Sequence, residues 1–158
     1  MISYTKKDVV TTTKGIILHQ TNCMGAMNSG VAKAIREKWP IVFEKYSEYV
    51  NSFGDQKWRL LGKAYRVRID EHLSVYNLFG QYDFGYDNSR RTEYSALNNA
   101  MSIVISDVEF DYEMEGNDIL IPDLIGCGVA KGDKTIVMEI IKHNFERYKG
   151  NVLICSIQ

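Results

Sequence analysis

The run "GIILH" (15–19) constrains the fold more than any other stretch of the sequence. It is short, continuous and apolar, and it contains β-branched isoleucines. This composition is typical of a strand whose two faces are both buried. Such a strand requires helices on each side of its sheet. The sequence therefore predicts a sandwiched sheet.

Extended and helical patterns alternate along the rest of the chain. Further strands are expected over residues 2–4, 64–69, 73–79, 118–122 and 151–157. Apolar residues recur at helical spacing over 31–39, 42–50, 94–104 and 132–148. Pro40 separates the first two helices, Thr92 is a candidate N-cap for the third, and the turn "DEH" makes 64–79 a hairpin. We predict one α/β domain over residues 1–158, with a mixed sheet between helical layers.

Charge and cysteine content limit the classes of function. The 19 basic and 20 acidic residues argue against a protein that mainly holds long nucleic acid, so a small ligand is expected. The cysteines are odd in number and lack a CxxC pair, and the N-terminus lacks the apolar core of a signal peptide. No apolar stretch approaches the length of a membrane span. We therefore expect a reducing, cytoplasmic setting and no membrane partner.

Two glycine-rich connections, "NCMGAMNSGVA" (22–32) and "IGCGVAKGD" (125–133), each follow an apolar strand and precede a helix. Glycine lets a ligand approach backbone amides, and a helix N-terminus presents free N–H groups to an anion. Side by side, the two loops could cradle a diphosphate, although each alone could be an ordinary tight turn. Neither matches the common nucleotide-binding signatures. The aperiodic loop 80–91 is also long enough to be functional.

Several polar residues near these loops could carry chemistry. The Asn22 amide could bind a pair of sugar hydroxyls or its own loop backbone. His19 could move a proton near neutral pH or be a satisfied strand-end residue. Asp8 has a structural reading as a strand-end turn residue, while Cys23 and Cys127 lack a basic partner and are expected to fill space. The three histidines are too far apart along the chain to suggest a metal site, so no metal is expected.

Taken together, these segments resemble the macro domain, a family that binds ADP-ribose. The resemblance covers essentially the whole chain and is carried by "ISYTKKD", residues 15–40, "NLFGQ", "RRTEYSALNNAM" and "ILIPDLIGCGVAKGD". It is strongest to the compact branch of ADP-ribose 1″-phosphate phosphatases and ADP-ribosyl-ester hydrolases, which is common in bacteria and phages. The resemblance implies a three-layer α/β/α sandwich with a mixed sheet of about six strands.

The resemblance also implies roles for individual residues. Asp8 matches the acidic residue that accepts a hydrogen bond from the adenine amino group, and Asn22 matches the asparagine that meets the distal ribose. His19 would move a proton while Asn22 orients the terminal phosphate or a water, without metal or cofactor. The implied ligand-binding residues are Asp8, Val9, Asn22, Gly25, Ser29, Gly30, Val31, Ala32, Ile125, Gly126, Cys127, Gly128, Val129 and Ala130.

Three departures from the family pattern bear on activity. Gln81 and Ala130 stand where ester hydrolases of this branch have a lysine and an aspartate, which argues against lysine-mediated ester hydrolysis. Asn28 stands where glycine is frequent, and asparagine tolerates the left-handed backbone. The leading hypothesis is an ADP-ribose 1″-phosphate phosphatase that acts as a monomer. The alternatives are a non-catalytic ADP-ribose-binding module, an ADP-ribosyl hydrolase acting on modified macromolecules and, from "NSRR" and "RVR", a nucleic-acid-end binder.

Overall fold

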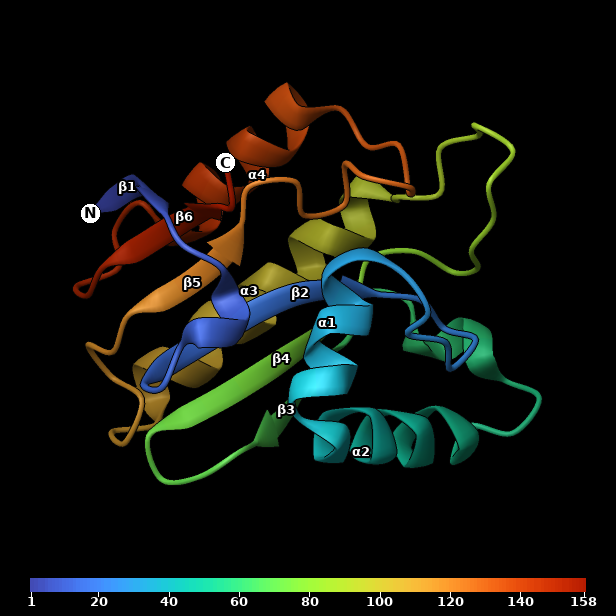
Figure 1. Ribbon diagram of the computed structural model, residues 1–158, viewed down its shortest axis with the longest axis horizontal. Helices are drawn as coiled ribbons and strands as arrows, with labels where there is room; N and C mark the ends of the chain where they lie inside the picture. Colours follow the sequence, from blue (N-terminus) through green and yellow to red (C-terminus); the bar gives the residue numbers. More distant parts are fainter.

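A six-stranded sheet in the order β1-β6-β5-β2-β4-β3 runs through the middle of the computed structural model, which describes residues 1–158 (Figure 1). All neighbouring strands are parallel except β3, which pairs antiparallel with β4. The sheet is therefore mixed, as predicted. The strands are β1 (Ile2–Lys6), β2 (Gly15–Thr21), β3 (Ala64–Arg68), β4 (Leu73–Phe79), β5 (Ile119–Pro122) and β6 (Val152–Ser156).

Two pairs of helices cover the two faces of this sheet (Figure 1). The pair α1 (Gly30–Lys38) and α2 (Pro40–Asn51) covers one face, and the pair α3 (Tyr94–Phe110) and α4 (Lys134–Phe145) covers the other. Short 3₁₀ turns occupy Val9–Thr11 and Lys57–Leu60. The three-layer α/β/α sandwich is thus confirmed. None of the helices combines the length and apolarity that crossing a membrane would require.

The central strand β2 shows why a sandwich forms. Ile16 and Leu18 pack into the core below α3 and α4, whereas Ile17 packs into the core below α1 and α2. Successive strand residues point to opposite faces, so an unbroken apolar run must be covered on both sides. β4 is buried along its whole length for the same reason. The prediction made from "GIILH" is confirmed.

The helix boundaries are less well predicted than the helices themselves. Glu93, not Thr92, is the N-cap residue of α3, and the Thr92 hydroxyl instead donates to the Gly126 carbonyl at 2.6 Å. α4 begins at Lys134, where the Asp133 carboxylate accepts from two backbone N–H groups, and it ends at Phe145 rather than at 148. Caps depend on tertiary partners as well as on residue type. The predicted hairpin of β3 and β4 is confirmed.

One edge of the sheet collects the loops that could bind a ligand. Because β1, β6, β5, β2 and β4 are parallel, their carboxyl ends all reach this edge. The segments that follow them therefore meet there, although they are far apart in the sequence. These segments include residues 22–29 after β2, 80–91 after β4 and 123–133 after β5. The fold thus places the two glycine-rich loops on the same side of the molecule.

Candidate functional site

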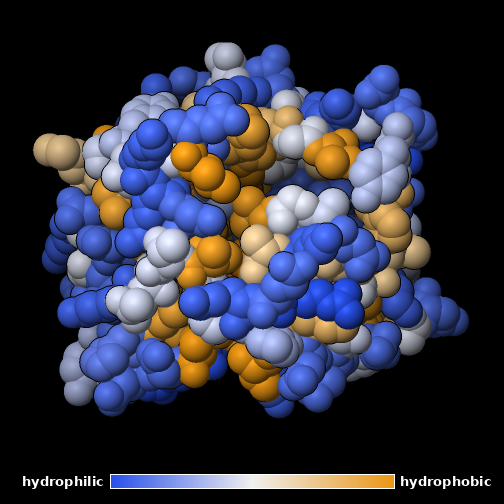
Figure 2. Space-filling view, viewed as in Figure 1, coloured by the Kyte–Doolittle hydropathy of each residue, from blue (hydrophilic) through white to orange (hydrophobic).

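A cavity of about 470 Å³ opens at the carboxyl edge of the parallel strands. Its volume lies within the range of about 300–1,000 Å³ that is usual for small-molecule sites. In the space-filling view, apolar side chains gather around a hollow near the centre of the side of the molecule that is shown (Figure 2). The cavity extends from Lys7 and Ser156, at the ends of β1 and β6, to Gln81 and Arg91 beside β4. It is therefore elongated across the sheet.

Most of the residues expected to contact a ligand line this cavity. They are Asp8, Val9, His19, Asn22, Ser29, Gly30, Val31, Ala32, Ile125, Gly126, Gly128, Val129 and Ala130. Gly25 and Cys127 do not line it. Gly25 instead makes a turn with φ of 83°, a conformation that favours glycine, and Cys127 packs against the core below α3 and α4. Whether the lining residues touch a ligand stays a prediction.

Other parts of the wall were not predicted from the sequence. Loop 80–91 contributes Phe84, Tyr86 and Arg91, and the end of β6 contributes Ser156 and Ile157. The aperiodic composition of the loop drew attention to it as a whole, but not to these side chains. The β6 residues could have been found from the rule that ligands bind beyond the carboxyl ends of parallel strands. That rule could be applied only after the strand directions were known.

Asn22 organises the first glycine-rich loop. Its Oδ1 accepts from the backbone N–H of Met24 at 2.9 Å and of Ala26 at 3.3 Å, while its Nδ2 donates to the Ala26 carbonyl at 2.9 Å. The Tyr46 hydroxyl donates to the Asn22 carbonyl at 2.6 Å and lies 3.0 Å from its Oδ1. Asn22 is only 8% exposed. The backbone-binding role considered from the sequence is therefore present, and one Nδ2 hydrogen remains for a ligand.

The second glycine-rich loop is held by a network of side chains from β2 and from the connection between β4 and α3. The Gln20 Nε2 of β2 donates to Gln81 Oε1 and to Thr92 Oγ1, both at 2.9 Å. Thr92 in turn donates to the Gly126 carbonyl, which also accepts from the Gly132 N–H at 2.8 Å. A Cβ on Gly126 would approach Gln20 Oε1 to 2.9 Å, and its φ is 68°. The positive φ, together with this close approach, favours glycine at position 126.

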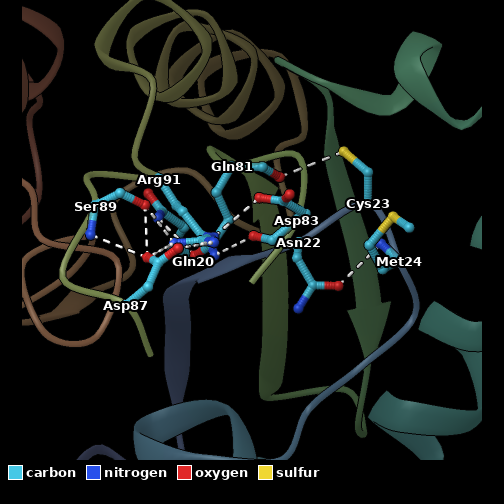
Figure 3. A network of polar contacts seen from close by, with 9 residues as sticks. All are labelled: Gln20, Asn22, Cys23, Met24, Gln81, Asp83, Asp87, Ser89 and Arg91. Carbon is cyan, nitrogen blue, oxygen red and sulfur yellow. Dashed lines mark hydrogen bonds and ion pairs between the residues drawn. The ribbon is translucent and has the colours of Figure 1, made fainter. Parts of the chain in front are cut away.

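The hydrogen-bond network continues into loop 80–91, where other residues of the loop surround the Arg91 side chain (Figure 3). Its Nε donates to Asp83 at 3.1 Å, and its Nη1 donates to Asp87 at 2.8 Å and to Ser89 at 2.6 Å. The hydrogen bonds that Asp87 accepts from Arg91 and from the Ser89 hydroxyl and N–H hold the pKa of Asp87 well below its usual range. The Arg91 backbone N–H also donates to the Ala130 carbonyl at 2.8 Å. Arg91 therefore joins this loop to the second glycine-rich loop, and its charge is compensated locally.

His19 lies at the floor of the cavity in an environment that keeps it uncharged. The residue is 1% exposed, and its Nε2 lies 2.7 Å from Asn77 Oδ1. Burial lowers the pKa of His19 to about 4, against a smaller opposing effect of the Asn77 hydrogen bond. A proton carrier that changes charge near neutral pH does not fit this environment. The catalytic role predicted for His19 thus finds no support in its protonation state.

The cysteines are poorly suited to nucleophilic attack. Burial, with a further contribution from Glu93, raises the pKa of Cys23 to about 12, and its Sγ donates to the Gln81 carbonyl at 3.4 Å. Burial also raises the pKa of Cys127. Both thiols are therefore protonated at neutral pH. No group of three or more His, Cys, Asp or Glu side chains is placed to hold a metal ion.

These features describe a three-layer α/β/α domain with a cavity at the carboxyl edge of a mixed sheet. Comparison with solved structures then gives the particular fold. The macrodomain protein of Streptomyces coelicolor superposes with a TM-score of 0.77 at 22% identity, covering 99% of both chains. Thermosipho africanus DarTG in complex with ADP-ribose superposes with a TM-score of 0.77 at 14% identity, over 98% of this chain and 41% of that one. The chain has the macrodomain fold, as its sequence predicted.

Sequence comparison adds one relative. A stretch of 68 residues is 32% identical to an ADP-ribose 1″-phosphate phosphatase of Debaryomyces hansenii. The matched stretch makes up 39% of this chain and 38% of that protein, so it spans well under half of the relative. No family model matches the sequence.

Proposed function

We propose that the cavity binds ADP-ribose or a derivative of it. The observation that carries this proposal is that two glycine-rich loops, which follow β2 and β5, border one elongated cavity. The cavity crosses five strands, from β1 to β4, which corresponds to about 19 Å at about 4.8 Å per strand. This length suits a ligand with a sugar at each end of a diphosphate.

The chemistry changes along the cavity in a way that matches such a ligand. At the β1 end, Asp8 Oδ1 accepts from the Val10 N–H at 3.2 Å and keeps lone pairs for an amino group. In the middle, α1 begins at Gly30 without a side-chain cap on its first N–H groups. Ser29, Gly30 and Val31 line the cavity at this point. Free N–H groups at a helix N-terminus favour an anion such as a diphosphate.

Hydrolysis of ADP-ribose 1″-phosphate is the reaction that we propose for this site. The similarity to a protein named for that activity supports it. Phosphoryl transfer proceeds through a loose transition state and depends mainly on positioning and on stabilisation of charge on the phosphate oxygens. Backbone N–H groups of the glycine-rich loops can provide this stabilisation without a strong base. Asn22 would orient the terminal phosphate or the attacking water.

A non-catalytic reader of ADP-ribose is the second candidate. Two observations favour it: His19 stays neutral at physiological pH, and neither Gln81 nor Ala130 can ionise. These residues also count against lysine-dependent ADP-ribosyl hydrolysis. Monomeric action on a small molecule, rather than on nucleic acid, and a reducing cytoplasmic setting remain part of the proposal. The three free thiols agree with such a setting.

Calorimetry with ADP-ribose, together with phosphate release from ADP-ribose 1″-phosphate, tests these candidates. Binding with phosphate release supports the phosphatase, and binding without release supports the reader. Gly128→Glu is the control, because a Cβ at Gly128 meets open space and the fold should survive while negative charge enters the cavity. The absence of heat and of competition with a labelled nucleotide would contradict ADP-ribose binding altogether.

A further inference from the structure

Two residues that line the cavity, His19 and Gln20, each carry a buried side-chain atom with no hydrogen-bond partner within the protein: His19 Nδ1 and Gln20 Oε1. His19 lines the cavity, and its Nδ1 is enclosed without a donor in reach. A buried polar atom that makes no hydrogen bond destabilises the protein in which it lies. When such an atom belongs to a residue that lines a cavity, a bound ligand could supply the missing hydrogen bond. The kind of group depends on whether Nδ1 carries a proton.

A chain of hydrogen bonds decides the protonation of the ring. Asn77 on β4 donates from Nδ2 to the Tyr65 carbonyl of β3 at 3.1 Å. This bond fixes the amide orientation, because the reversed amide would place Oδ1 against the Tyr65 oxygen. Asn77 Oδ1 therefore faces His19 Nε2 at 2.7 Å and requires a proton there. A neutral ring with its proton on Nε2 has a lone pair on Nδ1.

Asn77 is well placed to enforce this tautomer. It is fully buried, and it lies directly opposite His19 in the parallel register of β2 and β4. Neither side chain can therefore turn to water for a different partner. The backbone carbonyl of Tyr65, two strands away from β2, thus determines which nitrogen of His19 can meet a ligand.

We propose that His19 Nδ1 accepts a hydrogen bond from a hydroxyl of the terminal ribose, and that Asn77 is the positioning residue that keeps this nitrogen unprotonated. The inference rests on the proposed function. β2 lies three strands from β1 in the sheet, about 14 Å at about 4.8 Å per strand, so His19 serves the end of the ligand remote from Asp8. A fully ionised phosphate has no proton to donate, and its oxygens would face a lone pair. This point of the cavity therefore selects a hydroxyl.

Affinities for ADP-ribose and ADP, which lacks the terminal ribose, provide the test. His19→Phe keeps a ring of similar size and removes the acceptor. We expect this substitution to weaken the binding of ADP-ribose about tenfold, or by about 1.4 kcal/mol, and to leave the affinity for ADP unchanged. His19→Asn places an oxygen near the Nδ1 position and should recover part of the loss. His143→Phe, an exposed site on α4, is the matched control and should change neither affinity.

Nitrogen-15 NMR of the histidines tests the tautomer in the unaltered protein, so it does not depend on the folding of a variant. With only three histidines, assignment is direct. We expect neutral His19 with its proton on Nε2, and an Nδ1 resonance that moves with ADP-ribose but not with ADP. A proton on Nδ1 at neutral pH would overturn the proposal. If the ratio of the affinities for ADP-ribose and ADP were unchanged in His19→Phe, the hydroxyl contact alone would be overturned. If the unaltered protein bound neither nucleotide, the proposed function would be overturned with it.

Discussion

Replacement of Asn22 by alanine should reveal how far one side chain holds the first glycine-rich loop together. The substitution removes the acceptor for the N–H groups of Met24 and Ala26 and the donor to the Ala26 carbonyl. The Tyr46 hydroxyl still donates to the backbone carbonyl of residue 22, so it does not lose its hydrogen-bond partner. Three backbone groups therefore lose their partner in a loop that water reaches only partly. Both the stability of the domain and its ligand affinity should fall.

The magnitude follows from these three groups. An unsatisfied buried polar group costs about 1–3 kcal/mol, and partial access of water puts the sum near the lower limit, at about 3 kcal/mol. For a chain of this size, 1 kcal/mol lowers Tm by about 2–4 °C, so Asn22→Ala should lower Tm by about 6–12 °C. Differential scanning calorimetry measures Tm, and urea denaturation gives the free energy of unfolding independently.

Two matched variants separate the contributions of the loop bonds. Asn22→Asp keeps the acceptor for Met24 and Ala26 but sets a carboxylate against the Ala26 carbonyl, so an intermediate loss is expected. Tyr46→Phe removes only the hydroxyl above the loop and should cost about 1 kcal/mol, the value of one hydrogen bond. A Tm for Asn22→Ala within about 2 °C of the parent protein would refute this reasoning, because the loop would then be held by something else. Weaker ADP-ribose binding at unchanged stability would assign Asn22 to the ligand alone.

Four further outcomes are expected. Asp8→Ala should weaken ADP-ribose by about 1.5–3 kcal/mol in calorimetry, because an amino group loses a charged acceptor; unchanged affinity would remove Asp8 from the site. Gly128→Glu should abolish binding at unchanged Tm, whereas Gly132→Ala should lower Tm because its Cβ would collide with the carbonyl of residue 126; equal Tm values in the two variants would contradict this. Burial lowers the pKa of His19 from 6.5 to about 4 in the folded state, so the unfolded state binds more protons between these pH values. The free energy of unfolding should therefore be unaffected by His19 above about pH 6.5 and should fall by about 3 kcal/mol as the pH drops towards 4. His19→Phe should flatten that part of the pH–stability curve, and a parallel curve would argue against the lowered pKa. Arg91→Ala should expose loop 80–91 to limited proteolysis, because its guanidinium contacts two aspartates of the loop; an unchanged cleavage pattern would show that the loop is held without it.

The glycine-rich loops show how far sequence reasoning could reach into the site. Their composition indicated ligand-binding connections after strands, and most of the residues assigned to them line the cavity. Gly25 and Cys127 belong to the same sequence segments but do not line it. One sets a turn, and the other faces the core. Composition identifies a loop, but the direction of each residue within it depends on the backbone path, which neighbouring elements determine.

His19 shows that the protonation state of a side chain is equally hard to predict from the sequence. Its position before Asn22 suggested a proton carrier, because an unperturbed histidine changes charge near neutral pH. Its actual state depends on Asn77, which is 58 residues further along the chain, and on the depth of burial between two helical layers. Neither could be known before β2 and β4 were seen to be neighbours. Thr92, expected to be a helix cap, likewise bonds a loop 34 residues away.

The sequence by itself determined the kinds of elements, because the spacing of apolar residues is a local property with a period of about 2 for strands and 3.6 for helices. It also determined that β2 must be buried on both faces, and hence that the fold has three layers. The tertiary structure alone decided the strand order, the cavity that spans from β1 to β4, the enclosure of Arg91 and the neutral state of His19. The physical reason is that pKa values and hydrogen-bond partners depend on distances in space, and these are set only when segments remote in the sequence pack together.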